Sequence, residues 1–173
     1  ETKNETSDNF DYNVTQFEDI KILLYQIPSW DNLTLKEQKL VYYLTQAGLE
    51  GRDIIWDQNY RHNLAIRTAL EQIYTTYKGD KQSQDWANFE TYIKRVWFAN
   101  GIHHHYSNAK MKPAFSSDYL QSLLTDSGAT LNGDAFAVLF NDKDAKKVNL
   151  TKDVDNVLLS AVNFYGPDVT TAD

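Results

Sequence analysis

The chain has 173 residues, of which 42% are hydrophobic and 13% aromatic, so it can build a packed core and is not disordered throughout. It contains no cysteine, which excludes disulfides and thiolate metal sites. Its formal net charge of -7 repels a phosphate backbone, so nucleic acid is not an expected partner.

The first fourteen residues are polar and acidic and show no helical periodicity. We expect a flexible tail over 1–14, followed by a single mainly helical domain or partial domain over 15–173. Such a tail suits an exported, processed protein as well as a cytoplasmic one, so the compartment stays open. No apolar run in the sequence reaches the roughly 20 residues that a membrane-spanning helix needs.

The first predicted helix covers residues 15–27. Thr15 and Glu18 have the spacing of a capping box, in which each side chain bonds the other residue's backbone N–H. Apolar residues then recur at helical spacing as far as Pro28, which cannot continue a helix.

A second capping box, Thr34 with Glu37, opens a second predicted helix whose apolar face runs toward Gly51 or a little beyond. The glycines near its end either let a neighbouring helix approach closely or break the helix. A third helix is predicted over 58–78, where Gly79 would take the left-handed position that often follows a helix.

The second half of the chain carries four more candidate elements. Helices are predicted over 84–100, over 118–124 and over 151–165, the last with Thr151 as its N-cap. The short apolar run 135–140 fits either a buried strand or a short buried helix, which periodicity does not separate. The sequence therefore predicts a mainly α fold with about six helices and at most one short strand.

Three of the four histidines are consecutive, His103, His104 and His105, and Tyr106 follows them. A metal site is disfavoured because consecutive side chains point in different directions, so at most His103 and His105 could face one ion. No His-x-x-x-His or His-Glu-x-x-His motif accompanies them. Two interpretations stay open: a polar surface loop that caps the preceding helix, and a loop that lines a substrate site.

Other chemistry finds less support in the sequence. The charged residues around Arg52, from Glu50 to Asp57, are typical of a solvated helix end. No Gly-x-Ser-x-Gly elbow and no glycine-rich phosphate loop occurs. The many aromatic residues fall on helical stripes, which indicates core packing.

Four segments resemble stretches of the dipeptidyl-peptidase III family, in its Bacteroides-type bacterial form. They are LVYYLTQAGLEGRDI over 40–54, parts of 58–67, YTTYKGDK over 74–81, and YIKRVWFANGIHHHYSNAKMKP over 92–113. The last is the longest and most specific. The likeness extends from about Phe17 to the C-terminus and is weaker beyond Thr125.

The resemblance implies the N-terminal region of a two-lobed metallopeptidase, a hydrolase that removes dipeptides from the free amino end of oligopeptides. In that family zinc is held in the other lobe by a His-Glu-x-x-x-His helix and a downstream Glu, and this sequence contains no such helix motif. The resemblance thus implies no catalytic residue, metal ligand or cofactor in this chain. Its partners would be the oligopeptide substrate and the remaining lobe, and the isolated chain would not hydrolyse peptides.

Site residues follow from the same resemblance. Tyr106 falls on an aromatic position of the family's cleft wall, and Lys110 and Pro113 fall on a Lys-x-x-Pro ending. We expect Tyr106, with His105 and Asn108 beside it, to bind substrate by positioning the peptide.

Two other functions remain compatible with the residues. The chain could be a stand-alone helical module that binds a peptide or protein without catalysis, or a small metal-binding protein that uses His103 and His105. An exposed apolar face would also allow two copies to pair as a homodimer.

Overall fold

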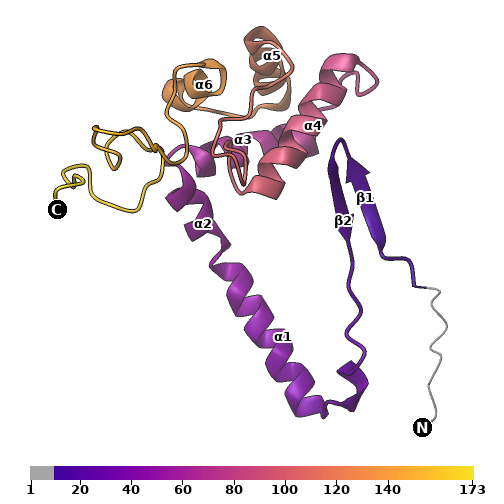
Figure 1. The fold of residues 1–173 in the computed structure, drawn as a ribbon. Helices are drawn as coiled ribbons and strands as arrows, with labels where there is room; N and C mark the ends of the chain where they lie inside the picture. Colours follow the sequence, from indigo (N-terminus) through magenta and orange to yellow (C-terminus); the bar gives the residue numbers. More distant parts are fainter. Residues whose placement is uncertain (1–9) are drawn as a thin grey trace. The chain divides into compact units, whose positions relative to one another are not determined.

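The computed structural model describes residues 10–173, and its contacts divide the chain into a unit that ends at Gln46 and a unit from Ala47 to Asp173. Each unit is described by itself (Figure 1). Most of the predicted tail over 1–14 lies outside the described residues, but Asn13 and Val14 belong to a strand. The proposed domain over 15–173 stays a prediction.

The described residues are mainly helical, as predicted. In chain order the elements are β1 (Asn13–Phe17), β2 (Ile20–Leu23), a 3-10 turn η1 (Trp30–Asn32), α1 (Leu35–Glu50), α2 (Arg52–Asn59), α3 (Asn63–Thr76), α4 (Gln84–Ala99), α5 (Ser117–Ser127) and α6 (Gly133–Phe140).

The predicted helix over 15–27 is wrong. Strands β1 and β2 form an antiparallel hairpin in which Phe17 pairs with Ile20, and Glu18 takes a left-handed backbone with φ of 47° in the turn. The segment is rich in β-branched and aromatic residues on both sides of Glu18, which favours a pleated pair over a helix. Thr15 and Glu18 have the spacing of a capping box, but no helix begins at this position.

The second capping box is confirmed. The backbone N–H of Thr34 donates to Glu37 Oε2 at 2.8 Å, and the N–H of Glu37 donates to Thr34 Oγ1 at 3.4 Å. The hydrogen bonds from Thr34 lower the pKa of the Glu37 carboxyl group. Helix α1 ends before Gly51 and α2 begins after it, so the glycine breaks the helix.

The predicted helix over 58–78 is two helices, because α2 continues to Asn59 and an extended Tyr60 ends it. Helix α3 begins at Asn63 and contacts α2, α4, α5 and α6, so it is the central helix of the unit from Ala47 onward (Figure 1). Its stripe of Ile66, Leu70 and Ile73 is buried, as the periodicity indicated. The expected left-handed turn at Gly79 is not found, because Tyr77, in an extended conformation, already ends α3.

Helices α4, α5 and α6 confirm the predictions over 84–100 and 118–124 and resolve the apolar run 135–140 as a helix. Each helix has an N-cap residue whose side-chain oxygen accepts a hydrogen bond from a backbone N–H of the first turn. The N-caps are Ser83 for α4, Ser116 for α5 and Asn132 for α6. The fully buried residues of α4 and α5 pack against α3. They include Phe89, Ile93, Leu120 and Leu123.

The predicted helix over 151–165 is wrong, since this segment consists of turns and bends. The Asp155 carboxylate accepts from the backbone N–H groups of Val157, Leu158 and Thr171, and these bonds lower the pKa of Asp155. Such local side-chain bonds offer the backbone an alternative to helical pairing. Asp153 also takes a left-handed φ of 61°, which a helix does not allow.

Within residues 10–173, no helix is both long enough and apolar enough to cross a bilayer.

Candidate functional site

The candidate site is the loop that follows α4, from Gly101 to Pro113. Its start is fixed by a sharp reversal: Asn100 has a left-handed backbone with φ of 52°, and Gly101 has φ of 148°. The N–H of Asn100 donates to Trp97 O and Val96 O, which closes the last turn of α4.

Asn63, at the first position of α3, anchors this reversal. It is fully buried, its Nδ2 donates to Trp56 O at 3.1 Å, and its Oδ1 accepts from the N–H of Ile102 at 3.2 Å. A Cβ atom on Gly101 would lie 2.2 Å from Asn63 Nδ2, so only glycine allows this approach. The start of the loop is therefore tied to α2 and α3.

The loop then folds as a narrow hairpin. His103 pairs with Lys110 in an antiparallel bridge, the N–H of His104 donates to Ala109 O at 2.7 Å, and the N–H of Met111 donates to Ile102 O at 2.8 Å. His104 closes the tip, because its Nδ1 accepts from two backbone N–H groups further along, those of Tyr106 and Ser107, each at 3.1 Å. An accepting Nδ1 places the proton of the neutral ring on Nε2.

His103 is a buried structural residue rather than part of an exposed surface. It is 2% exposed, its Nε2 lies 2.9 Å from Ala145 O, and its ring meets Tyr60 edge-on with centroids 5.3 Å apart. A carbonyl can only accept, so Nε2 carries the proton and donates. Burial lowers the pKa of His103 and raises the pKa of Tyr60, whose hydroxyl donates to Asp144 at 3.1 Å.

Lys110 holds the far side of the hairpin. Its Nζ donates to the backbone carbonyls of Val138 and Asn141, where α6 ends. The positive charge of Lys110 therefore lies at the negative pole of that helix. Burial lowers the pKa of Lys110. Lys110, the lysine of the Lys-x-x-Pro ending, thus attaches the loop to the end of α6.

The exposed tip carries a row of rings. The ring of His105 stacks on His104 with centroids 4.4 Å apart, contacts Tyr106 at 4.3 Å, and meets Phe98 of α4 edge-on at 4.8 Å. Tyr106 is 84% exposed, whereas the three histidines before it are buried or partly buried. We call Phe98, His104, His105 and Tyr106 the aromatic ladder.

The structure brings together two of the three predicted substrate-binding residues. Tyr106 and His105 are neighbours in the aromatic ladder. Asn108, with a left-handed φ of 60°, instead lines a cavity of about 240 Å³ formed with Ser107, Lys146 and residues 148–151. Its backbone O accepts from the N–H of Lys147 at 3.0 Å, which ties the tip to the C-terminal segment.

Two members of the aromatic ladder, Phe98 and His104, were not among the predicted site residues. Phe98 is the residue after Trp97, the last residue of the apolar stripe of α4. Its side chain is 41% exposed, so it faces outward. The two acceptor bonds of His104 depend on the hairpin geometry, which the sequence does not show.

Two histidines of the loop use a ring nitrogen to stabilise the fold. His103 Nε2 is bonded to Ala145 O and His104 Nδ1 is bonded to two amides, so these nitrogens are engaged with the backbone. In the part of the chain that the structure describes, no three His, Asp or Glu side chains converge on one point. The aromatic ladder can stack on a peptide plane or an apolar side chain, and the exposed phenol of Tyr106 can form hydrogen bonds.

No family model matches the chain, and no curated protein matches it either.

Proposed function

We propose that this chain is the N-terminal helical region of a zinc-dependent dipeptidyl-peptidase III-like exopeptidase, where it supplies scaffold and one wall of the peptide-binding cleft. The observation that carries the proposal is the aromatic ladder: two half-buried histidine rings that lie beside the exposed rings of Phe98 and Tyr106, within the segment 92–113 that has the most specific resemblance to the family.

The segments with that resemblance also support one another physically. Asn63, in the segment 58–67, is hydrogen-bonded to the backbone of Ile102, in the segment 92–113. Asn59 Nδ2 likewise donates to Asn100 O at 3.0 Å. Both contacts position the loop that presents the aromatic ladder, which is what a rigid cleft wall requires.

The role of Tyr106 and His105 is to hold the peptide. The exposed phenol of Tyr106 offers stacking area together with a donor and an acceptor, and the His105 ring packs beside it. The bond-making groups and the zinc ligands belong to the other lobe of such an enzyme, so this chain contributes no ligand to the metal.

Binding of short peptides tests the role of the aromatic ladder. The ¹⁵N-labelled chain is titrated with Ala-Ala-Phe-Ala, and amide shifts are followed. We expect shifts clustered at 104–108 and a dissociation constant on the order of a millimolar, because one lobe provides only part of the contacts. Tyr106→Ala should weaken binding by about fivefold or more. Tyr25→Ala is the matched control, since Tyr25 is 82% exposed, close to the 84% of Tyr106.

Three results would contradict the proposal. If Tyr106→Ala and Tyr25→Ala bind the peptide equally well, the aromatic ladder is not a peptide contact. Reading the gene past the codon for Asp173 tests the family separately: a frame that continues into a His-Glu-x-x-x-His helix supports an exopeptidase. A stop codon there supports the stand-alone binding module. Hydrolysis of a dipeptidyl-arylamide by the isolated chain would refute its assignment as a non-catalytic region.

A further inference from the structure

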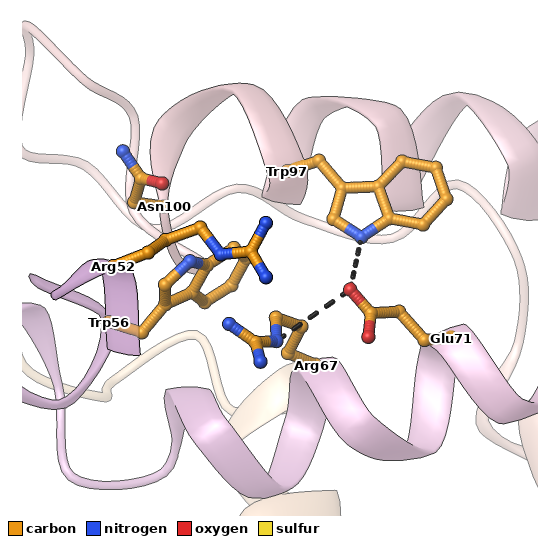
Figure 2. A pocket seen from close by; sticks show the side chains of 6 residues that line it. All are labelled: Arg52, Trp56, Arg67, Glu71, Trp97 and Asn100. Atoms are coloured by element: carbon orange, nitrogen blue, oxygen red, sulfur yellow. Dashed lines mark hydrogen bonds and ion pairs between the residues drawn. The ribbon is translucent and has the colours of Figure 1, made fainter. Parts of the chain in front are cut away.

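A second pocket is formed by residues of α2, α3 and α4 and by Asn100, which follows α4. It has a volume of about 310 Å³ and is lined by Arg52, Trp56, Arg67, Glu71, Trp97 and Asn100. Figure 2 shows the side chains of Arg52 and Arg67 reaching into the same space, bounded by Trp56 on one side and by Trp97 with Glu71 on the other. We call this the arginine pocket.

Arg67 is fixed in place at the base of the arginine pocket. Its side chain is 14% exposed, its Nη1 lies 2.8 Å from Asp53 Oδ1, and its guanidinium lies over the Trp56 ring at 5.2 Å from the centroid. Its Nε is 3.6 Å from Glu71 Oε1, too far for a hydrogen bond, and has no other acceptor among residues 10–173. A buried donor without an acceptor costs stability, so this group favours an added acceptor.

Trp56 adds a second donor without a partner. The residue is 2% exposed, and its Nε1–H donates to no atom in the described part of the chain. The indole of Trp97 differs, because its Nε1 donates to Glu71 Oε1 at 2.9 Å (Figure 2). The indole N–H of Trp97 thus has a hydrogen-bond acceptor, whereas the indole N–H of Trp56 has none in the described part of the chain.

Arg52 completes the donor set. Its guanidinium makes no hydrogen bond or ion pair with residues 10–173, and Figure 2 shows it extending between Trp56 and Trp97 into the space that Arg67 also lines. Two like charges directed at one space repel each other unless an anion lies between them. Arginine presents a planar fork of N–H groups that matches a carboxylate in a bidentate arrangement.

We propose that the arginine pocket binds a carboxylate group, either the free C-terminus of a peptide or the side chain of an acidic residue. Asp53 and Glu71 both pair with Arg67, which leaves the charge of Arg52 unpaired, so one additional negative charge is favoured over the two of a phosphate. The flat walls of Trp56 and Trp97 suit a planar anion with an apolar group attached.

Indole N–H signals report on this site directly. The chain has four tryptophans, so a ¹⁵N spectrum shows four indole signals, and Trp56 is assigned with Trp56→Phe. The probes are N-acetylglycine as a chain-end carboxylate, the α-amide of N-acetylglutamic acid as a side-chain carboxylate, N-acetylglycinamide as the neutral control, and inorganic phosphate. Arg52→Gln removes the exposed guanidinium, and Arg61→Gln is a control with the same charge change outside the pocket.

We expect at least one carboxylate probe to shift the Trp56 indole signal with a dissociation constant on the order of a millimolar, and the neutral amide to leave it unchanged. Which carboxylate binds more tightly identifies the source of the ligand. Arg52→Gln should weaken binding by about tenfold, whereas Arg61→Gln should have no effect.

The proposal is overturned if neither carboxylate moves the Trp56 signal, if Arg52→Gln and Arg61→Gln behave alike, or if phosphate binds more tightly than both carboxylates. None of these outcomes bears on peptide binding at Tyr106, so failure here leaves that test standing.

Discussion

Replacing Gly101 by alanine should be the most damaging small change in the unit that begins at Ala47. The backbone at Gly101 has φ of 148°, which L-residues rarely adopt, and strain of this kind costs about 1–3 kcal/mol. The new Cβ would lie 2.2 Å from Asn63 Nδ2 and 2.8 Å from Asn63 Cγ, so the Asn63 side chain has to move. Losing its bonds to Trp56 O and Ile102 N leaves buried groups unsatisfied, at about 1–3 kcal/mol each. We expect a total loss of about 3–9 kcal/mol.

Urea unfolding followed by tryptophan fluorescence measures this loss, because Trp56, Trp86 and Trp97 all belong to that unit. Two glycine controls separate the contributions. Gly128→Ala has a positive φ of 67° but no described atom within 4 Å of the new Cβ, so it should cost only about 1–2 kcal/mol of backbone strain. Gly133→Ala, at the start of α6, has neither problem and should be neutral or stabilising by up to about 1 kcal/mol.

The reasoning is refuted if Gly101→Ala costs no more than Gly128→Ala. A double-mutant cycle gives a sharper check, because Asn63→Ala removes the atoms that the new Cβ would meet. The two substitutions together should therefore cost clearly less than the sum of each alone. Simple additivity would show that the contact between Gly101 and Asn63 is not the cause.

Three further predictions concern single residues. Burial lowers the pKa of His103 below its ordinary 6.5, so its contribution to stability is present above that pH and is lost as the pH falls through the lowered value. Urea midpoints should therefore drop more between about pH 7.5 and pH 5 in the parent than in His103→Gln. Lys110→Met should cost about 1 kcal/mol and speed hydrogen exchange at the end of α6, where its ammonium binds two carbonyls. Asn132→Ala removes the N-cap of α6 and should also cost about 1 kcal/mol in urea unfolding, while unchanged stability would show that the cap is dispensable.

The sequence predicts those helices that have a buried stripe and a clear terminus. Helix α4 is the best case, because its apolar residues recur at helical spacing and meet the α3 core. The two wrong helices lack that support. Over 15–27 the apolar spacing also fits a hairpin, and the pairing of β1 with β2 decides between the two structures. Over 151–165 the Asp155 carboxylate bonds nearby backbone N–H groups, which offers the backbone an alternative to helical pairing.

The candidate site is predictable to a similar degree. Consecutive histidines beside Tyr106 mark the loop as unusual, and the resemblance points to Tyr106 and His105. The different roles of the three histidines do not follow from the sequence, since they are set by Ala145, by backbone amides of the loop and by Phe98. The arginine pocket is also hidden from sequence reasoning, because its donors come from separate helices and look like ordinary surface charge.

Helix α1 has a consequence for how the purified chain should behave. Across its 16 residues not one side chain is buried by the described part of the chain, while Leu40, Tyr43 and Leu44 are each more than half exposed. A helix of that length, without packing, is marginally stable in water. It should therefore fray on a timescale far shorter than global unfolding, and its exposed apolar side chains favour self-association as the protein concentration rises.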